Sequence, residues 1–363
     1  SLCLLLLVLA VIVFFCIFRR RRSSRPQIIS LPPVLQTHEP KTSNSYTEHT
    51  AILPQDPWLV DRSHLVVNFD KKLGAGAFCN VFHGHLKRRS SGGVAHAPRS
   101  FPPQLLGDLD VAVKVLPDFA DAIARSDFMQ EINFMKRLSY HPHLVSMLAW
   151  VSSQPSPLLV VELCIKGDLL HFIRRNKDDI VNGYENLEGL KFKDVLSFTW
   201  QVANGLEYLN SIGCIHRDVA ARNVLVDAEN HCKIGDFGLC RLMDSLIYQA
   251  RGGRLPLRWM SPKALASLEY SFKSDVWAYG VLVWELFSLG DVPYLGIDSS
   301  ALLPHLNSGN RLPRPSWCTD EIFSLLLQCW DEDPLRRPDF SSLSSQVAAM
   351  LEKATEEYGY LRP

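Results

Sequence analysis

IHRDVAARNVLVD, residues 215–227, sets ionisable and amide side chains among apolar residues in one short stretch. Its central polar residues are His216, Arg217, Asp218, Arg222 and Asn223. Groups of this kind cost free energy beside an apolar core unless each is paired or hydrogen-bonded. The stretch therefore indicates chemistry as well as packing.

A second acidic residue, Asp236, follows in the stretch IGDFGLC. Asp218 and Asn223 lie five residues apart on the same predicted loop. A carboxylate and an amide can hold a metal ion while a second carboxylate acts as a base. Phosphoryl transfer needs these groups because it depends on positioning and charge neutralisation more than on covalent help from the protein. Each residue alone has an ordinary structural explanation, but their order and spacing together favour phosphoryl transfer.

Two features upstream fit the same chemistry. In LGAGAFCNV, Gly74 and Gly76 lie between two strand-like runs, where glycine lets backbone N–H groups approach a polyphosphate closely. A simple hairpin turn explains this glycine pair equally well. Lys114 lies within the apolar strand VAVKVL, and a buried ammonium needs a partner. Glu131, on the helix predicted next in the chain, has the charge to be that partner.

The periodicity of apolar residues predicts a small β-rich lobe followed by a larger helical lobe. Strands are predicted at 65–69, 79–86 and 111–116. A helix is predicted at 126–138, capped by Ser126 or Asp127, and a second one starts at Asp194 and stops at Gly213. Surface insertions are predicted at 87–108 and 174–193 from their loop-like composition.

Composition narrows the class of function. The chain has 363 residues, of which 47% are apolar, enough for one large domain or two smaller ones. Its formal net charge is zero, so the total charge gives no case for nucleic-acid binding. The nine cysteines include no CxxC pair, which predicts free thiols instead of a disulfide framework or a metal site.

The first residues predict a transmembrane helix. Residues 1–18 carry no charge, and RRRRSSR follows directly. Eighteen helical residues at about 1.5 Å each span roughly 27 Å, close to the thickness of a bilayer's hydrocarbon core. A signal peptide would place its positive charges before the apolar run, and a buried core helix would show a polar face.

The arginine cluster predicts the orientation of this helix in the plasma membrane. Positive residues mark the cytoplasmic side, so the chain after residue 22 is expected in the cytoplasm. Residues 19–62, basic and then Ser/Pro-rich, are predicted to be a juxtamembrane segment. Since the chain begins without Met and apparently inside the apolar run, we interpret it as a fragment that lacks an extracellular portion.

From residue 63 to 354 the chain resembles the protein kinases. The family's motifs occur in order as the Gly-rich loop, VAVK, Glu131, HRDVAARN, DFG, SDVWAYG and CWDEDPLRRPDF. The resemblance implies an α+β fold of two lobes, with a β-rich N-lobe and a helical C-lobe, preceded here by the single transmembrane helix. The implied bounds are N-lobe 63–161, hinge 162–167, C-lobe 168–354 and C-terminal tail 355–363.

The resemblance also implies the roles of the site residues, with ATP and magnesium (Mg2+) as cofactors. Asp218 would accept the proton of the substrate hydroxyl, assisted by Arg222. Lys114 would bind the phosphates of ATP and pair with Glu131. Magnesium would be held by Asn223 and Asp236. The other residues expected around the nucleotide are Leu73, Gly74, Ala75, Gly76, Ala77, Phe78, Val81, Ala112, Glu162, Cys164, Asp168 and Leu225.

The same comparison points to the substrate class. Serine/threonine kinases usually carry Lys two residues after the catalytic Asp, whereas this chain has Ala220 there and Arg222 before Asn223, as tyrosine kinases do. RLPLRWM, residues 254–260, also resembles the tyrosine-kinase substrate platform. With a membrane span, the chain is similar to the receptor tyrosine kinases. That similarity implies tyrosine-containing protein substrates, a homodimer, phosphotyrosine-binding adaptors and an extracellular ligand as partners.

Tyr248 is the only tyrosine between DFG and SPK. We predict that it is trans-phosphorylated, because a phosphate there would pair with Arg251 and Arg254 and order the loop. A plain exposed tyrosine is the alternative. Further candidate phosphosites for docking are Tyr184, Tyr358 and Tyr360.

Two positions depart from the kinase pattern. The third glycine of the phosphate loop is Cys79, whose thiol is expected near ATP. Lys263 stands where the family has a Glu that pairs with the arginine here numbered Arg337. Breaking a buried ion pair costs roughly 3–5 kcal/mol. Three outcomes are open: Lys263 turns to solvent, Asp339 replaces the missing acid, or the activation segment is poorly anchored.

These departures leave two alternatives to an active tyrosine kinase. One is a pseudokinase receptor that acts as a signalling scaffold, which only Cys79 and Lys263 favour. The other is a serine/threonine kinase. The intact catalytic set, Lys114, Asp218, Asn223 and Asp236, favours an active enzyme.

Overall fold

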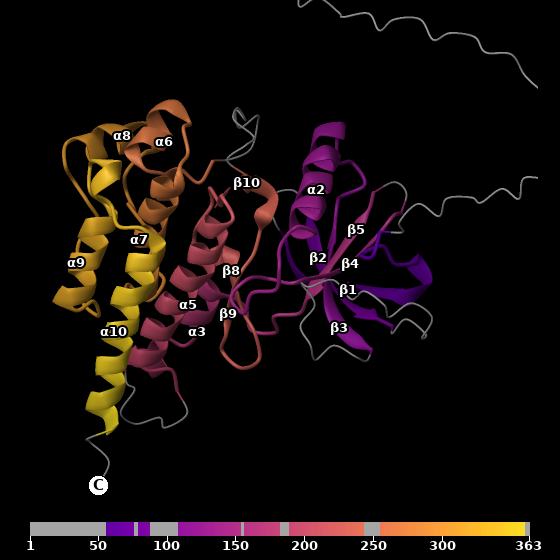
Figure 1. Cartoon of the computed structure of the whole chain (residues 1–363), viewed down its shortest axis with the longest axis horizontal. Coiled ribbons are helices and arrows are strands. Elements are labelled where there is room, and N and C mark those ends of the chain that lie inside the picture. Colours follow the sequence, from indigo (N-terminus) through magenta and orange to yellow (C-terminus); the bar gives the residue numbers. More distant parts are fainter. Residues whose placement is uncertain are drawn as a thin grey trace, which may run out of the picture. The chain divides into compact units, whose positions relative to one another are not determined.

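A five-stranded antiparallel sheet carries Gly74 and Lys114 (Figure 1). Its strands, in spatial order, are β1 (Leu65–Ala75), β2 (Asn80–Leu86), β3 (Leu109–Val115), β5 (Leu158–Glu162) and β4 (Met147–Val151). The helix α2 (Ala122–Met135) lies beside this sheet and buries Phe128, Ile132 and Met135. The computed structural model describes residues 56–75, 79–87, 108–153, 156–181, 189–242 and 255–359.

The rest of the described chain is mainly helical. Its helices are α3 (Leu169–Arg175), α4 (Lys177–Val181), α5 (Phe192–Ser211), α6 (Pro262–Ser267), α7 (Phe272–Phe287), α8 (Ser299–Asn307), α9 (Asp320–Cys329) and α10 (Phe340–Gly359). In α7 every residue from Ser274 to Phe287 is buried. A helix buried on all sides forms the centre of a core, and α9, α5 and α3 pack against α7. The predicted β-rich lobe followed by a helical lobe is confirmed.

Short strands and turns are interspersed among these helices along the chain, and several of them carry the candidate chemistry. A three-stranded sheet joins β6 (Gly167–Asp168), β8 (Val224–Val226) and β9 (Cys232–Ile234), and β7 (Cys214–Ile215) pairs with β10 (Arg241–Leu242). Single turns of 3-10 helix are η3 (Ala221–Asn223), η4 (Phe237–Leu239), η5 (Leu257–Trp259) and η6 (Pro334–Arg336). The strands β7 and β8 therefore flank residues 216–223, which carry Asp218 and Asn223.

Helix boundaries differ in part from the predictions. The cap predicted at Ser126 or Asp127 is wrong: α2 begins four residues earlier, because the side chain of Asp121 accepts a hydrogen bond from the N–H of Ala124 (2.7 Å). Asp194 is confirmed near the start of α5, where its carboxylate accepts from the N–H of Lys191 (2.7 Å). Gly213 adopts φ +75° just past the end of this helix.

The insertion predicted at 174–193 is shorter than expected at both ends. Residues 174 and 175 continue α3, residues 177–181 form α4 with Ile180 buried, and α5 already starts at Phe192. Charged side chains on the exposed faces of these helices gave the segment a loop-like composition. The insertion predicted at 87–108 falls between β2 and β3, and residues 88–107 lie outside the described residues.

The limits of the folded domain differ from the predicted ones at both ends. The segment predicted as juxtamembrane to residue 62 ends earlier, because Trp58 is buried in the main core and pairs through its backbone with Trp150. At the other end α10 runs to Gly359, past the predicted limit at 354. The predicted transmembrane helix at 1–18 lies outside the described residues, among which no helix has the length and apolarity to cross a membrane.

Candidate active site

Lys114 and Glu131 form the buried ion pair that the sequence predicts. Lys114 Nζ lies 2.5 Å from Glu131 Oε1, joining the middle of β3 to α2, and the two side chains are 14% and 6% exposed. Burial alone would lower the pKa of Lys114, but the carboxylates of Glu131 and Asp236 outweigh it, so its pKa is raised. The ammonium therefore stays charged where a phosphate would need it.

Asp236 turns its carboxylate toward this pair. Lys114 Nζ lies 3.9 Å from Asp236 Oδ1, and the Asp236 side chain is 48% exposed. Its backbone is left-handed, with φ 59°, a strained conformation that often occurs at functional sites. The next residue, Phe237, is buried between the rings of Phe134 (5.6 Å) and His216 (5.9 Å). This packing ties the turn at Asp236 to α2.

Asp218 is a largely enclosed carboxylate at the centre of the stretch 215–227. Its side chain is 14% exposed and pairs with the guanidinium of Arg222. Asn223 Nδ2 donates to the backbone oxygen of Asp218 (2.8 Å). Burial raises the pKa of Asp218, which Arg222 and Asn223 oppose only in part. A raised pKa makes this carboxylate a better proton acceptor than an ordinary exposed one.

The loop around Asp218 is held from α7 by Asp275, a role that the sequence analysis did not assign. Asp275 Oδ2 accepts the N–H of His216 (2.7 Å) and Oδ1 accepts the N–H of Arg217 (2.9 Å). Arg217 has φ 71°, and two charge-assisted hydrogen bonds stabilise that left-handed residue. The His216 ring also lies 3.1 Å from the carbonyl oxygen of Gly235, next to Asp236.

Residues expected around the nucleotide come from both lobes. Ala112 and Val161, on neighbouring strands β3 and β5, belong to the main apolar cluster, and Val81 and Leu225 pack against the same cluster. Leu73 is 43% exposed on β1. Gly74 pairs with Val81, and Ala75 ends β1. The phosphate-loop residues Gly76, Ala77 and Phe78 lie outside the described residues.

Asp168 and Cys164, a residue of the predicted hinge, each accept a hydrogen bond from a nearby backbone N–H. The carboxylate of Asp168 accepts from the N–H of His171 (3.0 Å) and so caps α3. The carbonyl oxygen of Cys164 accepts from the N–H of Gly167 (3.2 Å), closing the turn after β5. Both residues lie at the junction between the lobes, as the resemblance implies.

Cys79 lies close to Lys114 but is a weak nucleophile. Burial raises the pKa of its thiol to about 11, although Lys114 acts in the opposite direction. A thiol with this pKa is almost wholly protonated at neutral pH, and the thiolate is the reactive form.

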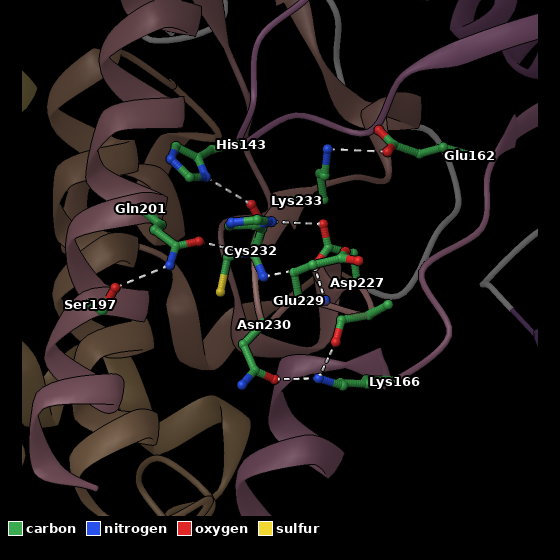
Figure 2. A network of polar contacts seen from close by, with 12 residues as sticks. His143, Glu162, Lys166, Ser197, Gln201, Asp227, Glu229, Asn230, Cys232 and Lys233 are labelled. Atoms are coloured by element: carbon green, nitrogen blue, oxygen red, sulfur yellow. Dashed lines mark hydrogen bonds and ion pairs between the residues drawn. The ribbon is translucent and has the colours of Figure 1, made fainter. Parts of the chain in front are cut away.

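Figure 2 shows the polar network that fixes β9, the strand leading to Asp236. Lys233 Nζ lies 3.1 Å from Glu162 Oε2 at the hinge, while Glu162 Oε1 accepts from the N–H of Ser146 (2.6 Å). The backbone N–H of Cys232 donates to Gln201 Oε1 (2.6 Å), and its carbonyl lies 3.1 Å from His143 Nδ1. Sequence reasoning missed Lys233, although a lysine between two apolar residues was a signal.

At the far end of the network, three hydrogen bonds shape the turn between β8 and β9 (Figure 2). The carboxylate of Asp227 accepts from the N–H groups of Glu229 (3.0 Å) and His231 (2.8 Å). Lys166 Nζ donates to Asn230 Oδ1 (2.6 Å). The carboxylate of Asp227 therefore has a structural role in this turn.

Glu285 joins the catalytic loop to the predicted substrate platform, and sequence reasoning missed it too. Its Oε2 accepts from the backbone N–H of Ala221 (3.0 Å) and from Trp259 Nε1 (2.9 Å). Arg222 lies over the Trp259 ring, with its guanidinium carbon 4.3 Å from the ring centroid. Burial raises the pKa of Glu285 to about 7. A single acid inside the apolar helix GVLVWELF was the available signal.

Lys263 turns to solvent, which is the first of the three predicted outcomes. It pairs with Glu269 at 2.9 Å, and both side chains are more than 60% exposed. Arg337 is buried and donates to the carbonyl oxygens of Asp331 (2.9 Å) and Lys273 (2.9 Å). Asp339 instead accepts from the N–H of Ser342 at the start of α10 (2.8 Å).

The geometry fits a nucleotide with a divalent metal ion. Asn223 and Asp236 offer an amide and a carboxylate, and hard oxygen donors suit magnesium. The partly exposed Asp236 carboxylate already lies near Lys114, so cationic and anionic groups meet at one point. The predicted phosphosite Tyr248, together with Tyr184 and Tyr360, lies outside the described residues, and Tyr358 falls within α10.

Comparison with known proteins agrees with this geometry. A family model for protein tyrosine and serine/threonine kinases matches residues 67–347. A protein of Caenorhabditis elegans named a "putative tyrosine-protein kinase" is 44% identical over 331 residues. The match covers 88% of this chain and 38% of that relative, so the chain spans less than half the length of the relative.

Proposed function

We propose that this chain, which belongs to the protein tyrosine and serine/threonine kinase family, transfers the γ-phosphate of ATP to tyrosine hydroxyls of proteins. The observation that carries the proposal is the position of Arg222, between the Asp218 carboxylate and the Trp259 ring. A planar guanidinium can pair with a carboxylate and stack on an aromatic face at once, which Lys cannot do equally well. Arg222 thus links the proton acceptor to the platform on which a substrate segment would lie.

Asp218 acts as the base in this proposal. Its carboxylate takes the proton of the incoming hydroxyl as the phosphoryl group is transferred. Burial raises its pKa, and the contact with Arg222 orients the carboxylate. Asp275 keeps the backbone of the loop in place through its bonds to His216 and Arg217.

Lys114 neutralises the phosphates of the bound nucleotide, and Glu131 fixes the direction of its ammonium. Asn223 and Asp236 would hold magnesium, which supplies further charge neutralisation at the phosphates when bound. The apolar residues Ala112 and Leu225 would contact the adenine ring of the nucleotide from the two lobes.

We further propose that the enzyme is a single-pass membrane receptor with a cytoplasmic kinase domain. The uncharged run at 1–18 followed by arginines supports the span and its orientation. In this proposal a second copy of the chain phosphorylates Tyr248, and adaptor proteins then bind to phosphotyrosines of the chain. Resistance of the chain to extraction from membranes at alkaline pH tests the span, and loss of the resistance on deleting residues 1–18 is its control.

The acceptor is tested with three peptides that differ only in carrying Tyr, Ser or Phe at one position. The purified full chain is given ATP and magnesium, beside Asp218→Asn. We expect phosphotyrosine on the first peptide and a loss of about 10²–10⁴-fold in the variant, the usual size of a general-base contribution. Phosphoserine as the main product would make the tyrosine assignment wrong. Nucleotide binding without turnover on any peptide would favour the scaffold alternative.

A further inference from the structure

Residues 56–60, which we name the leading segment, form an added edge beside β4. The N–H of Trp150 donates to the carbonyl of Trp58 (2.9 Å), and the N–H of Val60 donates to the carbonyl of Trp150 (3.0 Å). Leu59 and Trp150 form a parallel bridge. The Trp58 side chain is 5% exposed and belongs to the main core. The leading segment is therefore part of the kinase fold.

Asp56, at the start of the leading segment, gathers three hydrogen-bond donors. Its Oδ1 accepts from the N–H of Trp58 (3.0 Å), and its Oδ2 accepts from Trp150 Nε1 (2.9 Å) and Lys136 Nζ (2.6 Å). Lys136 Nζ also lies 4.2 Å from the centroid of the Trp150 ring. The side chains of Asp56 and Lys136 are 29% and 18% exposed. A charged pair with a third donor and an aromatic face is much better fixed than an exposed ion pair.

Lys136 caps the end of α2, the helix that carries Glu131. At about 100° per residue, Glu131 and Lys136 are separated by roughly 140° around the helix axis. The helix is thus held from two directions, at Glu131 by Lys114 and at Lys136 by Asp56. The apolar side chains of Phe128, Ile132 and Met135 already pack α2 into the core, and polar contacts on two different sides of the helix restrict its remaining rotation.

We propose that Asp56 is a positioning residue for phosphoryl transfer: through Lys136 it fixes the rotation of α2, so that Glu131 meets Lys114. The proposal rests on the kinase chemistry of the Lys114–Glu131 pair and is independent of whether the acceptor is tyrosine. Asp56 touches no reacting atom. Its effect is on the fraction of molecules in which Lys114 is correctly placed, and a small misplacement at a catalytic group has a large effect on rate.

The test is a double-mutant cycle on the purified full chain between Asp56→Asn and Glu131→Gln. The rate is measured as release of the γ-phosphate of ATP to any acceptor, so a wrong acceptor assignment leaves the result intact. We expect Asp56→Asn to lower kcat about tenfold in the parent, and less than about twofold when Glu131 is already Gln, because both act through one contact. Equal losses in both backgrounds would overturn the proposal.

The control is Asp333→Asn, at the cap residue that precedes η6, far along the chain. Asp333 likewise accepts a backbone N–H, that of Leu335 (2.9 Å), and lies near a cation, Arg336 (3.9 Å). We expect its kcat to stay within about twofold of the parent, as for a surface pair. A loss equal to that of Asp56→Asn would show a general effect on folding and overturn the proposal.

Hydrogen exchange in the nucleotide-free chain gives a readout that needs no activity. In Asp56→Asn, the amides of α2 should exchange faster while those of α7 keep the parent rate. Trp150→Phe removes one donor to Asp56 and keeps an aromatic face for Lys136, so it should show a smaller change of the same kind. Unchanged exchange in α2 in both variants would overturn the proposal.

Discussion

Two cations in this molecule, Lys114 and Arg337, have opposite kinds of partner. Lys114, at the active site, lies 2.5 Å from the carboxylate of Glu131. Arg337, just before α10, meets backbone carbonyl oxygens and the face of Trp277, with its guanidinium carbon 5.0 Å from the ring centroid. The family's acid partner for Arg337 is replaced by Lys263, which lies at the surface.

The difference follows from what each cation does. In the proposed function Lys114 meets a phosphate, so its ammonium has to be held at one point by one charge. Arg337 only anchors, and the five N–H donors of a guanidinium can be satisfied by neutral oxygens from several segments. Burial lowers the pKa of Arg337 to about 10, with Arg311 adding to the effect, yet it stays charged at neutral pH. An anchoring acid is therefore replaceable where a catalytic one is not.

The largest effect should come from neutralising Lys114. We expect Lys114→Met to lower phosphoryl transfer by about 10²–10³-fold, because a preorganised charge at the phosphates is lost. It should also destabilise the fold by roughly 3–5 kcal/mol, since Glu131 is left buried without its partner. Adding Glu131→Gln should restore much of the stability in urea unfolding and none of the rate. Recovery of the rate would contradict the role given to Lys114.

A smaller effect, on stability alone, is expected at the other cation. Arg337→Met removes the donors that satisfy the carbonyls of Lys273 and Asp331, which should lower the free energy of unfolding by about 2–4 kcal/mol. The catalytic rate per folded molecule should change less than about threefold, because no reacting group is touched. A loss below about 1 kcal/mol in urea unfolding would mean that these contacts do not anchor the segment.

The pH dependence of stability sharpens the comparison at Glu285, a buried acid whose donors, Ala221 N–H and Trp259 Nε1, are neutral. Burial raises its pKa to about 7 from an ordinary 4.5, so the folded chain retains a proton that the unfolded chain has released. The contribution of protonated Glu285 to the free energy of unfolding is complete below pH 4.5 and is lost as the pH rises through 7. Glu285→Gln should reduce this loss by up to roughly 3 kcal/mol between pH 5 and 8. Identical pH profiles of the two proteins in urea unfolding would refute the assignment.

The smallest effect should come from Lys263. Its pair with Glu269 is exposed on both sides, so Lys263→Ala should change the free energy of unfolding by less than about 1 kcal/mol. Lys263→Glu should leave the transfer rate within about twofold of the parent. A rise of tenfold or more in that variant would show that neutral carbonyls are a poor substitute for the family's acid.

Residues of the candidate catalytic site were easier to predict from sequence than residues that only position other groups. Lys114 and Glu131 could be paired from sequence because an isolated charge in an apolar strand demands a partner. The direction of Lys263 could not be predicted, since a long flexible side chain takes whichever partner the fold brings near. Asp56 looked like part of a linker, because its three donors come from 2 to 94 positions away in the chain.

The roles of Glu285 and of Asp275, which lies in the motif SDVWAYG, were missed for a similar reason. Both lie on α7, whose sequence reads as an ordinary apolar core helix. Their partners are backbone N–H groups of the catalytic loop, and a backbone donor leaves no mark in a sequence. The cap of α2 was misplaced because Asp121 and Ser126 are equally good capping residues, and only packing selects between them.

The burial of α7 has a consequence for the order in which activity is acquired during folding. The catalytic loop takes its conformation from Asp275 and Glu285, so it has no template until this helix is enclosed by its neighbours. On dilution from denaturant, the regain of phosphoryl transfer should therefore lag behind the regain of helical signal and coincide with burial of the α7 tryptophans, Trp277 and Trp284. The same dependence predicts that a chain in which α7 is not enclosed is inactive, even where its other helices have formed.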